Sequence, residues 1–349
     1  MKAVTVVPGE AGVARLEEIE EPDPALGSVL VEALAVGVCG TDVEIAGGRY
    51  GWASPGRERL VLGHESIGRV LDPGPSGLSI GDLVVGIVRR PDPVPCPQCA
   101  VGEWDMCSNG SYTERGIKQI DGFMSERWRI EPQYAVPVDK SLGILGVLLE
   151  PTTVVAKAWE QILTIGHRTF WDPERVLVLG AGPIGLLAAL IGVLRGFEVH
   201  VLDRVTSGPK PELVAALGAS YHASGIEELR FRPEIVIDCT GVPELVVQGI
   251  ITAAPGAVVC LTGVGSRIAA IPEAWDQSLA THLVLNNLVV FGSVNANRRH
   301  YYRAAKALAR ADKAWLEGLI TSRVDPDQFE RALDRRPQDI KVVVQFQQQ

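Results

Sequence analysis

The sequence has no excess of basic residues. Its 33 Lys and Arg residues are outnumbered by 42 Asp and Glu residues, and the formal net charge is -9. A nucleic-acid partner requires basic side chains that neutralise phosphates, so this composition argues against nucleic-acid binding.

Cysteine is too scarce for a disulfide framework. The 349 residues include six cysteines, and three of them, Cys96, Cys99 and Cys107, lie in one short stretch. This usage fits metal binding in a reducing compartment better than structural disulfides, and we expect a cytoplasmic protein.

Long apolar runs are also rare. One uncharged run, residues 176–194, is long enough to cross a membrane, but Gly180, Gly182 and Pro183 interrupt it. We interpret it as a strand followed by a helix. The apolar run at the N-terminus is too short for a signal peptide, so we expect no membrane segment.

Two kinds of pattern follow one another along the chain. Residues 1–140 contain short apolar runs separated by Gly and Pro turns, which predicts a compact, partly closed antiparallel barrel. From about residue 142, helices and strands alternate, with strands expected at 175–179 and 198–202 and a helix at 184–195. This alternation predicts parallel α/β units, and one last strand is expected at 340–344.

A glycine motif follows the first of these parallel strands. Residues 180–185 read Gly-Ala-Gly-Pro-Ile-Gly, where Pro183 and Ile184 open the expected helix. Gly180 permits the tight turn, Gly182 lets the backbone approach a pyrophosphate, and Gly185 lets helix and strand pack closely. With the helix N-terminus as a phosphate site, the motif predicts dinucleotide binding.

The residues after the second parallel strand bear on the cofactor. Asp203 lies eighteen residues after Gly185, where an acid accepts hydrogen bonds from the ribose and repels a 2′-phosphate. This favours NAD, although Arg204 leaves NADP open. A glycine-rich turn without a ligand and an FAD site are the alternatives.

The stretch 37–68 contains potential metal ligands. Cys39, His64 and Glu65 are of the types that bind zinc, and catalytic zinc sites use three protein ligands with an open position. Taken alone, the same residues are also compatible with a buried structural cysteine and a hydrogen-bonded core histidine.

In combination, these motifs resemble the zinc-dependent medium-chain alcohol dehydrogenases. The resemblance covers essentially the whole chain and rests on Gly37-x-Cys39-Gly40-Thr41-Asp42, Gly63-His64-Glu65, Glu150-Pro151 and the glycine motif. It implies an α/β protein with a GroES-like β-barrel catalytic domain, residues 1–154 and 296–349. A Rossmann doubly wound parallel sheet, residues 155–295, would be inserted between these segments.

The resemblance also implies a ligand set for catalytic zinc. Cys39 and His64 would bind the metal, and Glu65 and Glu150 would be further carboxylate ligands that exchange with water or substrate. Glu150 alone is equally compatible with a solvated acid at a helix start.

Two further residues take roles from the same resemblance. Thr41 matches the hydroxyl that receives the proton of the substrate. Asp42 matches the acid that holds the imidazole of His64 in its ligating tautomer.

The family's structural zinc lobe is incomplete in this sequence. Cys96, Cys99 and Cys107 match three of its four cysteines, but Pro93 stands where the first is expected. Asp92 could supply the fourth ligand. Otherwise the lobe holds no stable metal, because structural zinc is almost always four-coordinate.

Within this family the sequence is most similar to the glucose (aldose) 1-dehydrogenases. The similarity rests on 62–65, 116–128, 150–152 and 292–297, and implies that Thr41, Glu114, Glu150 and Asn295 contact the sugar or the nicotinamide side. Glu114 as a plain loop acid and Asn295 as a turn residue are the alternatives. A homodimer or homotetramer is expected by family analogy.

The expected reaction is oxidation of an aldose such as D-glucose at C1, with zinc and NAD or NADP as cofactors. The alternatives are a polyol, threonine or simple alcohol dehydrogenase of the same family. A non-catalytic NAD-binding sensor is the alternative from another functional class.

Overall fold

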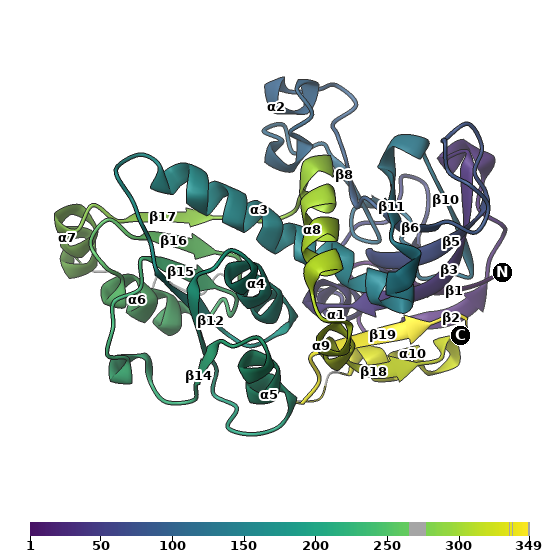
Figure 1. Ribbon diagram of the computed structural model, residues 1–349. Helices are drawn as coiled ribbons and strands as arrows, with labels where there is room; N and C mark the ends of the chain where they lie inside the picture. Colours follow the sequence, from purple (N-terminus) through teal and green to yellow (C-terminus); the bar gives the residue numbers. More distant parts are fainter. Residues whose placement is uncertain (265–276, 335, 337, 348–349) are drawn as a thin grey trace. The chain divides into compact units, whose positions relative to one another are not determined.

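The structure is a computed structural model that describes residues 1–264, 277–334, 336 and 338–347. The chain divides into two compact units (Figure 1). Unit 1 comprises Met1–Glu150, Ala296–Ala309 and Leu319–Gln349, and unit 2 comprises Pro151–Asn295 and Arg310–Gly318. Both ends of the chain therefore belong to unit 1.

Unit 1 is built mainly from strands. Within the described residues its largest sheet has the order β11-β6-β5-β3-β19-β18, and β10 also pairs with β3. Smaller sheets have the orders β2-β1-β4 and β7-β8-β9. The strands are β1 (Lys2–Val6), β2 (Arg15–Glu18), β3 (Val29–Val38), β4 (Leu60–Val61), β5 (Glu65–Asp72), β6 (Leu83–Gly86), β7 (Arg89–Arg90), β8 (Thr113–Arg115), β9 (Gln119–Ile120), β10 (Arg127–Ile130), β11 (Ala135–Val138), β18 (Ile320–Val324) and β19 (Lys341–Gln345).

Most helices of this unit are short. They are η1 (Pro24–Leu26), α1 (Gly40–Ala46), α2 (Pro97–Ala100), η2 (Trp104–Met106), η3 (Pro132–Tyr134), η4 (Lys140–Leu148), α8 (Arg298–Arg310), η6 (Pro326–Gln328) and α10 (Phe329–Leu333). η4 packs against β3, β5 and β6, so its apolar side chains extend the core of the barrel.

The expectation that the barrel sheet is antiparallel throughout is wrong at one edge. β18 and β19 are parallel. The chain between them passes through η6 and α10, and α10 packs against both strands. Parallel neighbours need such a crossover because a hairpin can join only antiparallel strands.

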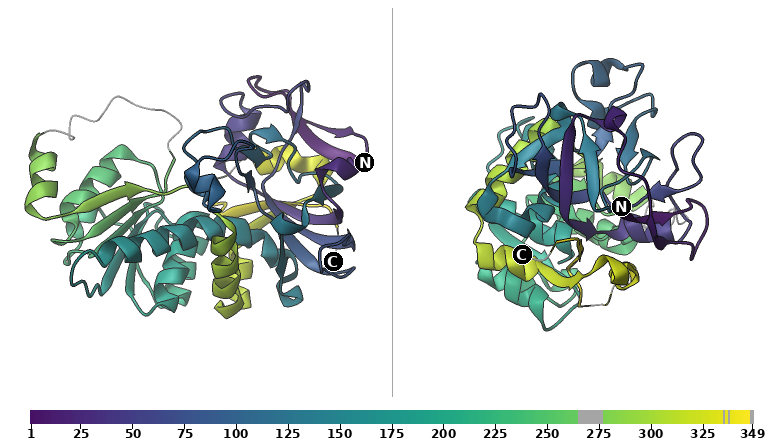
Figure 2. Two further views of the ribbon diagram at one scale, coloured as in Figure 1. Left: turned by 90° about the horizontal axis from the view of Figure 1, so that it is seen from above. Right: turned by 90° about the vertical axis from the view of Figure 1, so that its right-hand side faces the viewer.

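Unit 2 contains a parallel sheet with helices on both faces (Figure 2). Within the described residues its strand order is β14-β13-β12-β15-β16-β17. The strands are β12 (Arg175–Leu179), β13 (Glu198–Leu202), β14 (Ser220–His222), β15 (Ile235–Asp238), β16 (Val258–Leu261) and β17 (Val289–Gly292). The helices are α3 (Leu149–Gly166), α4 (Pro183–Leu194), α5 (Pro209–Ala216), η5 (Ile226–Glu228), α6 (Pro243–Thr252), α7 (Gln277–Leu285) and α9 (Lys313–Leu319).

The central strands of this sheet are almost continuously buried. β12 and β15 carry runs of Val, Ile and Leu because helices cover both of their faces. The predicted strands at 175–179 and 198–202 are confirmed with the same bounds. The order in which strands and helices alternate identifies a doubly wound sheet of the Rossmann type.

The uncharged run at 176–194 forms β12, a turn and α4, as predicted. Among the described residues, only Lys140–Gly166 is long and apolar enough to cross a membrane by length and composition. Its most apolar window is 78% buried inside the protein, which is typical of a core helix.

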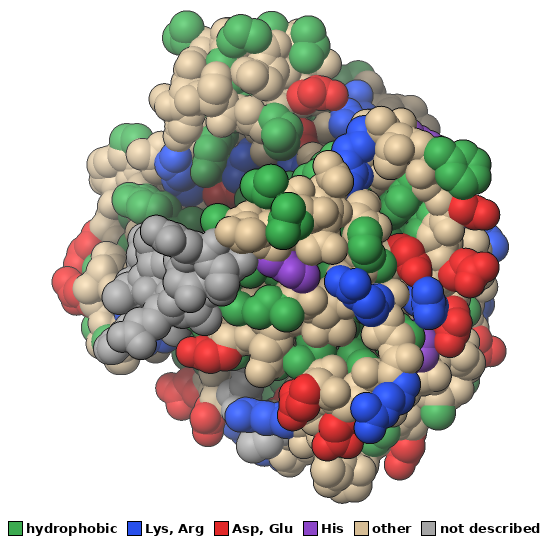
Figure 3. All heavy atoms as spheres, turned by 90° about the vertical axis from the view of Figure 1, so that its left-hand side faces the viewer, with side chains coloured by type: hydrophobic (Ala, Val, Ile, Leu, Met, Phe, Trp, Pro, Cys, Tyr) green, Lys and Arg blue, Asp and Glu red, His purple; other side chains and the backbone are tan. Residues whose placement is uncertain are grey.

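On the face in Figure 3, acidic and basic side chains are interspersed.

Candidate active site

The candidate metal site begins where β3 ends. Cys39 is the N-cap of α1, and its Sγ accepts a hydrogen bond from the backbone N–H of Thr41 at 3.3 Å. The Asp42 carboxylate accepts a hydrogen bond from the backbone N–H of Cys39 at 2.9 Å. This reciprocal capping fixes the position of the sulfur at the start of α1.

Strand pairing brings the other two ligands to this sulfur. β5 begins at Glu65, which lies opposite Gly37 of β3. His64 Nε2 consequently lies 3.1 Å from Cys39 Sγ. A ligand atom from each of Cys39, His64 and Glu65 lies within 4.8 Å of the other two. A thiolate, an imidazole and a carboxylate at this separation match the donor set of a catalytic zinc.

The negative charges of Asp42 and Cys39 favour the protonated form of the His64 imidazole. His64 Nδ1 lies 3.4 Å from Asp42 Oδ1, and both side chains are buried. Burial opposes the charge of His64, but Cys39 and Asp42 outweigh it and raise the pKa of His64 well above its usual value. Burial likewise opposes the charge of Asp42, but His64 outweighs it and lowers the pKa of Asp42.

Lys341 is a component of the cluster that the sequence analysis did not find. Its Nζ donates hydrogen bonds to both oxygens of Glu65, at 2.7 Å and 2.6 Å, and both side chains are buried. Lys341 is the first residue of β19, which pairs with β3 and so reaches the site from the far end of the sequence. No local motif marks it, because the two residues are separated by 276 positions.

Glu150 lies in the first turn of α3 and within electrostatic reach of the same charges. Burial and the charge of Glu65 raise the pKa of Glu150 to about 7, while His64 and Lys341 oppose this rise. Such a carboxyl exchanges a proton readily near neutral pH, as a catalytic acid or base must.

Glu114 lies on β8 and is held by Arg89. The two side chains are buried and form an ion pair at 3.0 Å. Tyr301, which the sequence analysis also missed, is buried within electrostatic reach of both Glu114 and Glu150. Burial raises the pKa of Tyr301 well above its usual value, and the charges of Glu150 and Glu114 both add to that rise. The Tyr301 hydroxyl accepts a hydrogen bond from Val88 at 3.2 Å.

Two other predicted residues lie at element ends. Thr41 is half-buried in the first turn of α1, directly after the residues that begin the metal cluster. Asn295 belongs to unit 2, between β17 and α8, and has a left-handed backbone with φ of 61°.

The cysteine lobe forms a second cluster in unit 1. The sulfur atoms of Cys96, Cys99 and Cys107 lie within 4.8 Å of one another. A hydrogen bond from the Cys99 backbone N–H lowers the pKa of Cys96 to about 6. Asp92 is not a member of this group, and its carboxylate accepts a hydrogen bond from the Val94 backbone at 2.8 Å.

The glycine motif forms the turn between β12 and α4. Gly182 is the N-cap of α4 and has no side chain to occupy the helix N-terminus, so the first N–H groups of α4 are available to a phosphate. A Cβ on Gly185 would lie 1.8 Å from the carbonyl oxygen of Gly180, so only glycine fits there. A Cβ on Gly182 would meet no heavy atom within 4 Å, which leaves room for a ligand.

Asp203 follows β13 and contacts this turn. Its Oδ2 accepts hydrogen bonds from the Ala181 backbone at 2.7 Å and from Lys210 Nζ at 3.1 Å. Burial opposes the charge of Asp203, but these bonds and one from Val205 lower its pKa. Arg204 is exposed. Lys210 is thus a second cation at the predicted ribose site, and the sequence analysis did not identify it.

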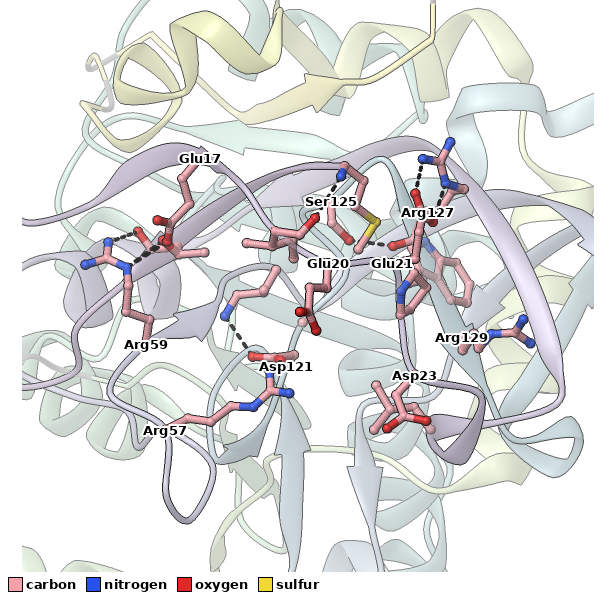
Figure 4. Close-up of a pocket in the computed structure, with 18 of the residues that line it drawn as sticks. Glu17, Glu20, Glu21, Asp23, Arg57, Arg59, Asp121, Ser125, Arg127 and Arg129 are labelled. Carbon is pink, nitrogen blue, oxygen red and sulfur yellow. Dashed lines mark hydrogen bonds and ion pairs between the residues drawn. The ribbon is translucent and has the colours of Figure 1, made fainter.

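A separate cavity of about 440 Å³ lies in unit 1. Its rim carries ion pairs between Arg57 and Asp121 and between Arg59 and Glu17 (Figure 4). None of the described residues that line it is Cys39, His64 or Glu65. The cavity is therefore distinct from the metal cluster.

The chain is similar to proteins of known activity over its whole length. Residues 25–140 match the family described as alcohol dehydrogenase GroES-like domain, and residues 143–346 match glucose dehydrogenase C-terminus. A glucose 1-dehydrogenase of Thermoproteus tenax is 41% identical over 99% of this chain and 100% of its own. A glucose 1-dehydrogenase of Methanocella arvoryzae is 37% identical over 99% of both chains.

A solved structure of a glucose dehydrogenase is also similar to this chain over its whole length. Haloferax mediterranei glucose dehydrogenase in complex with NADP, zinc and gluconolactone superposes with a TM-score of 0.91, at 32% identity and with 100% of both chains covered. The chain belongs to the zinc-dependent medium-chain dehydrogenases, within their glucose dehydrogenase branch. The resemblance and the fold class predicted from the sequence are confirmed.

Proposed function

We propose that the protein oxidises an aldose such as D-glucose at C1 to the aldonolactone and passes the hydride to NAD or NADP. The observation that carries this proposal is the group of Cys39, His64 and Glu65 within 4.8 Å of one another. It occurs in a chain that matches, over its full length, a glucose dehydrogenase with bound NADP, zinc and gluconolactone.

The donor set of this group supports zinc as the metal. Cys39 and His64 would hold it, with Glu65 or Glu150 as a further ligand. The chemistry that zinc supplies when bound is Lewis-acid polarisation of a substrate oxygen. Asp42 keeps the imidazole of His64 oriented, as its 3.4 Å separation from Nδ1 allows.

The protein's own residues would move the proton. Thr41 hydrogen-bonds the anomeric hydroxyl and passes its proton toward solvent. Glu150, with a pKa of about 7, is suited to bind that proton or release it near neutral pH. Glu114 and Asn295 would bind the remaining sugar hydroxyls, since a polyhydroxylated substrate needs a partner for each hydroxyl that it buries.

The dinucleotide would bind to unit 2. Gly180, Gly182, Pro183, Ile184 and Gly185 would surround the pyrophosphate, while Asp203 and Arg204 would contact the ribose. The nicotinamide supplies the hydride acceptor. We propose the same domain limits as above: residues 155–295 bind the cofactor, and residues 1–154 and 296–349 form the catalytic domain.

The cysteine lobe is proposed as a structural zinc site. Cys96, Cys99 and Cys107 would supply three sulfur ligands, and Asp92 would have to exchange its bond to the Val94 backbone for the fourth position. Metal analysis of the wild type tests whether the lobe binds zinc. Two zinc ions per chain would support this site, and one zinc ion per chain would contradict it.

The central experiment replaces Cys39 by Ala and measures turnover of D-glucose and zinc content. We expect turnover to fall by at least about 10³-fold and one zinc per chain to be lost, because a thiolate ligand is removed. Cys260→Ala is the matched control, since Cys260 is a buried thiol in β16 that belongs to neither cluster. Full activity of Cys39→Ala without metal at this site would contradict the mechanism.

A substrate panel distinguishes the alternatives. D-glucose, D-galactose and D-xylose represent aldoses, and sorbitol, threonine and ethanol represent the other dehydrogenases of the family. Each is assayed with NAD and with NADP. A non-catalytic sensor would bind the cofactor and turn over none of them.

We further propose a cytoplasmic homodimer or homotetramer. All six cysteines are free thiols, as expected in a reducing compartment. Among the described strands, β17 is one of the two edges of the parallel sheet, and a second copy could add its own β17 there.

A further inference from the structure

Two large aromatic side chains are half-exposed in unit 1. Tyr50 is 44% exposed and Trp52 is 47% exposed. Their ring centroids lie 5.0 Å apart and their planes meet at 71°, so the rings form an edge-to-face pair. A contiguous pair of this kind exposes more apolar surface than single surface residues do, which is typical of binding sites.

The backbone ties this pair to α1 on one side and to the segment after β8 on the other. The pair follows α1, the helix that begins at Cys39. Gly51 has φ of +94°, and a Cβ there would meet the Ile45 side chain of α1 at 3.0 Å, so the turn is pressed onto that helix. On its other side, the backbone N–H of Trp52 donates a hydrogen bond to the Ile117 carbonyl at 2.9 Å, just after β8.

A cation lies beside the pair, because Lys118 Nζ is 6.0 Å from the centroid of the Trp52 ring. The Tyr112 ring lies between the Arg89 guanidinium, 3.7 Å from its centroid, and Lys118 Nζ, 4.2 Å from it. Arg89 pairs in turn with Glu114. Burial and the charge of Glu114 raise the pKa of Tyr50, so its hydroxyl stays protonated and can donate a hydrogen bond.

We propose that Trp52, braced by Tyr50, is the surface on which the pyranose ring of the substrate stacks, and that this contact selects cyclic aldoses over acyclic polyols. The proposal rests on the function proposed above. A pyranose has C–H groups on its faces and hydroxyls around its edge. The indole would cover a face, while the hydroxyl of Tyr50 would bind a hydroxyl at the edge. An acyclic polyol has no rigid apolar face, so it gains less from the same indole.

The test compares Trp52→Ala, Trp52→Phe and wild type with D-glucose, D-xylose and sorbitol. We expect Trp52→Ala to raise the KM for both aldoses about tenfold, equivalent to about 1.4 kcal/mol, with kcat changed less than KM. The phenyl ring of Trp52→Phe should restore most of the affinity. Activity on sorbitol, if present, should change less than twofold, so that the preference for cyclic sugars falls.

A binding measurement provides a second readout. Gluconolactone should quench tryptophan emission of the wild type, and the quenching should be lost in Trp52→Phe. Phe170→Ala is the control, because Phe170 is an exposed aromatic residue in unit 2.

The outcomes separate the two proposals. A wild type that oxidises no aldose overturns the proposed function and this inference with it. An active wild type overturns only the inference if Trp52→Ala keeps its KM for D-glucose and D-xylose within twofold. An equal rise of KM for sorbitol overturns it as well, because the indole would then not distinguish cyclic from acyclic substrates.

Discussion

At the scale of single residues, the Glu65–Lys341 ion pair determines what Glu65 can do. Both oxygens of Glu65 accept hydrogen bonds from one ammonium group in a buried site. A carboxylate held in this way binds a metal only if it gives up part of that contact. We therefore expect Glu65 to bind zinc less readily than Cys39 and His64 do, with Glu150 or water as the alternative ligand.

Lys341→Met should destabilise the metal-free protein by about 3–5 kcal/mol, because it leaves a buried carboxylate without its partner. Zinc should restore part of this loss, since the metal can neutralise Glu65. Denaturant unfolding with EDTA and with zinc measures both effects. The control is Lys341→Met combined with Glu65→Gln, which removes both charges. A double variant no more stable than Lys341→Met would contradict the argument.

Asp203 offers a prediction for cofactor choice. Its carboxylate repels a 2′-phosphate, but Lys210 at 3.1 Å and exposed Arg204 are cations beside it. Asp203→Ser should raise the ratio of kcat/KM for NADP to that for NAD at least tenfold, on the order of 1.4 kcal/mol. Glu198→Gln removes a carboxylate at the opposite end of the same strand and serves as control. An unchanged ratio would show that Asp203 does not face the ribose.

At the scale of elements, local patterns predicted the buried parallel strands well. β12 and β13 were placed with the same bounds because their apolar runs and flanking turns are continuous in sequence. α1 was not predicted as a helix. It has only seven residues, and its N-cap is a cysteine rather than the usual Ser, Thr, Asp or Asn. The parallel pairing of β18 with β19 was also missed, because pairing partners are not encoded locally.

The same limit applies to the candidate site. Cys39, His64 and Glu65 could be grouped from the sequence because each lies in a short motif. Lys341 could not, since it reaches Glu65 through the pairing of β19 with β3.

The pairing of β13 with β14 predicts a pH dependence in unit 2. His200 Nδ1 lies 3.0 Å from His222 Nε2, and burial together with His200 lowers the pKa of His222. The unfolded chain then binds more protons than the folded chain as the pH falls below about 6.5, so stability should decrease there. His222→Asn should reduce that decrease.

Calorimetric melting of both proteins at about pH 7.5 and about pH 5.5 measures the effect, on either side of the ordinary histidine pKa. The difference between the two midpoints should be smaller in His222→Asn. Equal differences would mean that other groups cause the pH dependence.

At the scale of the whole molecule, β17 and α7 are candidates for an interface. Val284 and Leu285 on α7 are 74% and 75% exposed, and β17 has an unpaired edge among the described strands. Leu285→Lys should shift the native mass toward that of one chain, because it places a charge on the apolar surface that an interface would cover. Light scattering after size exclusion measures this mass, with Ile80→Lys in unit 1 as control. A wild type already monomeric would contradict the proposed assembly.

The position of β19 in the middle of the barrel sheet affects synthesis of the protein. β3 pairs with β5 on one side and with β19 on the other, although β19 begins 303 positions after the end of β3 (341 − 38). The parallel sheet of unit 2 is encoded between them, so it can fold while the ribosome is still translating. The barrel must wait until residues 341–345 have emerged, and until then Glu65 lacks its counter-ion. In nascent chains arrested before β19, unit 2 should therefore be folded, while the metal site should lack the Lys341 partner of Glu65.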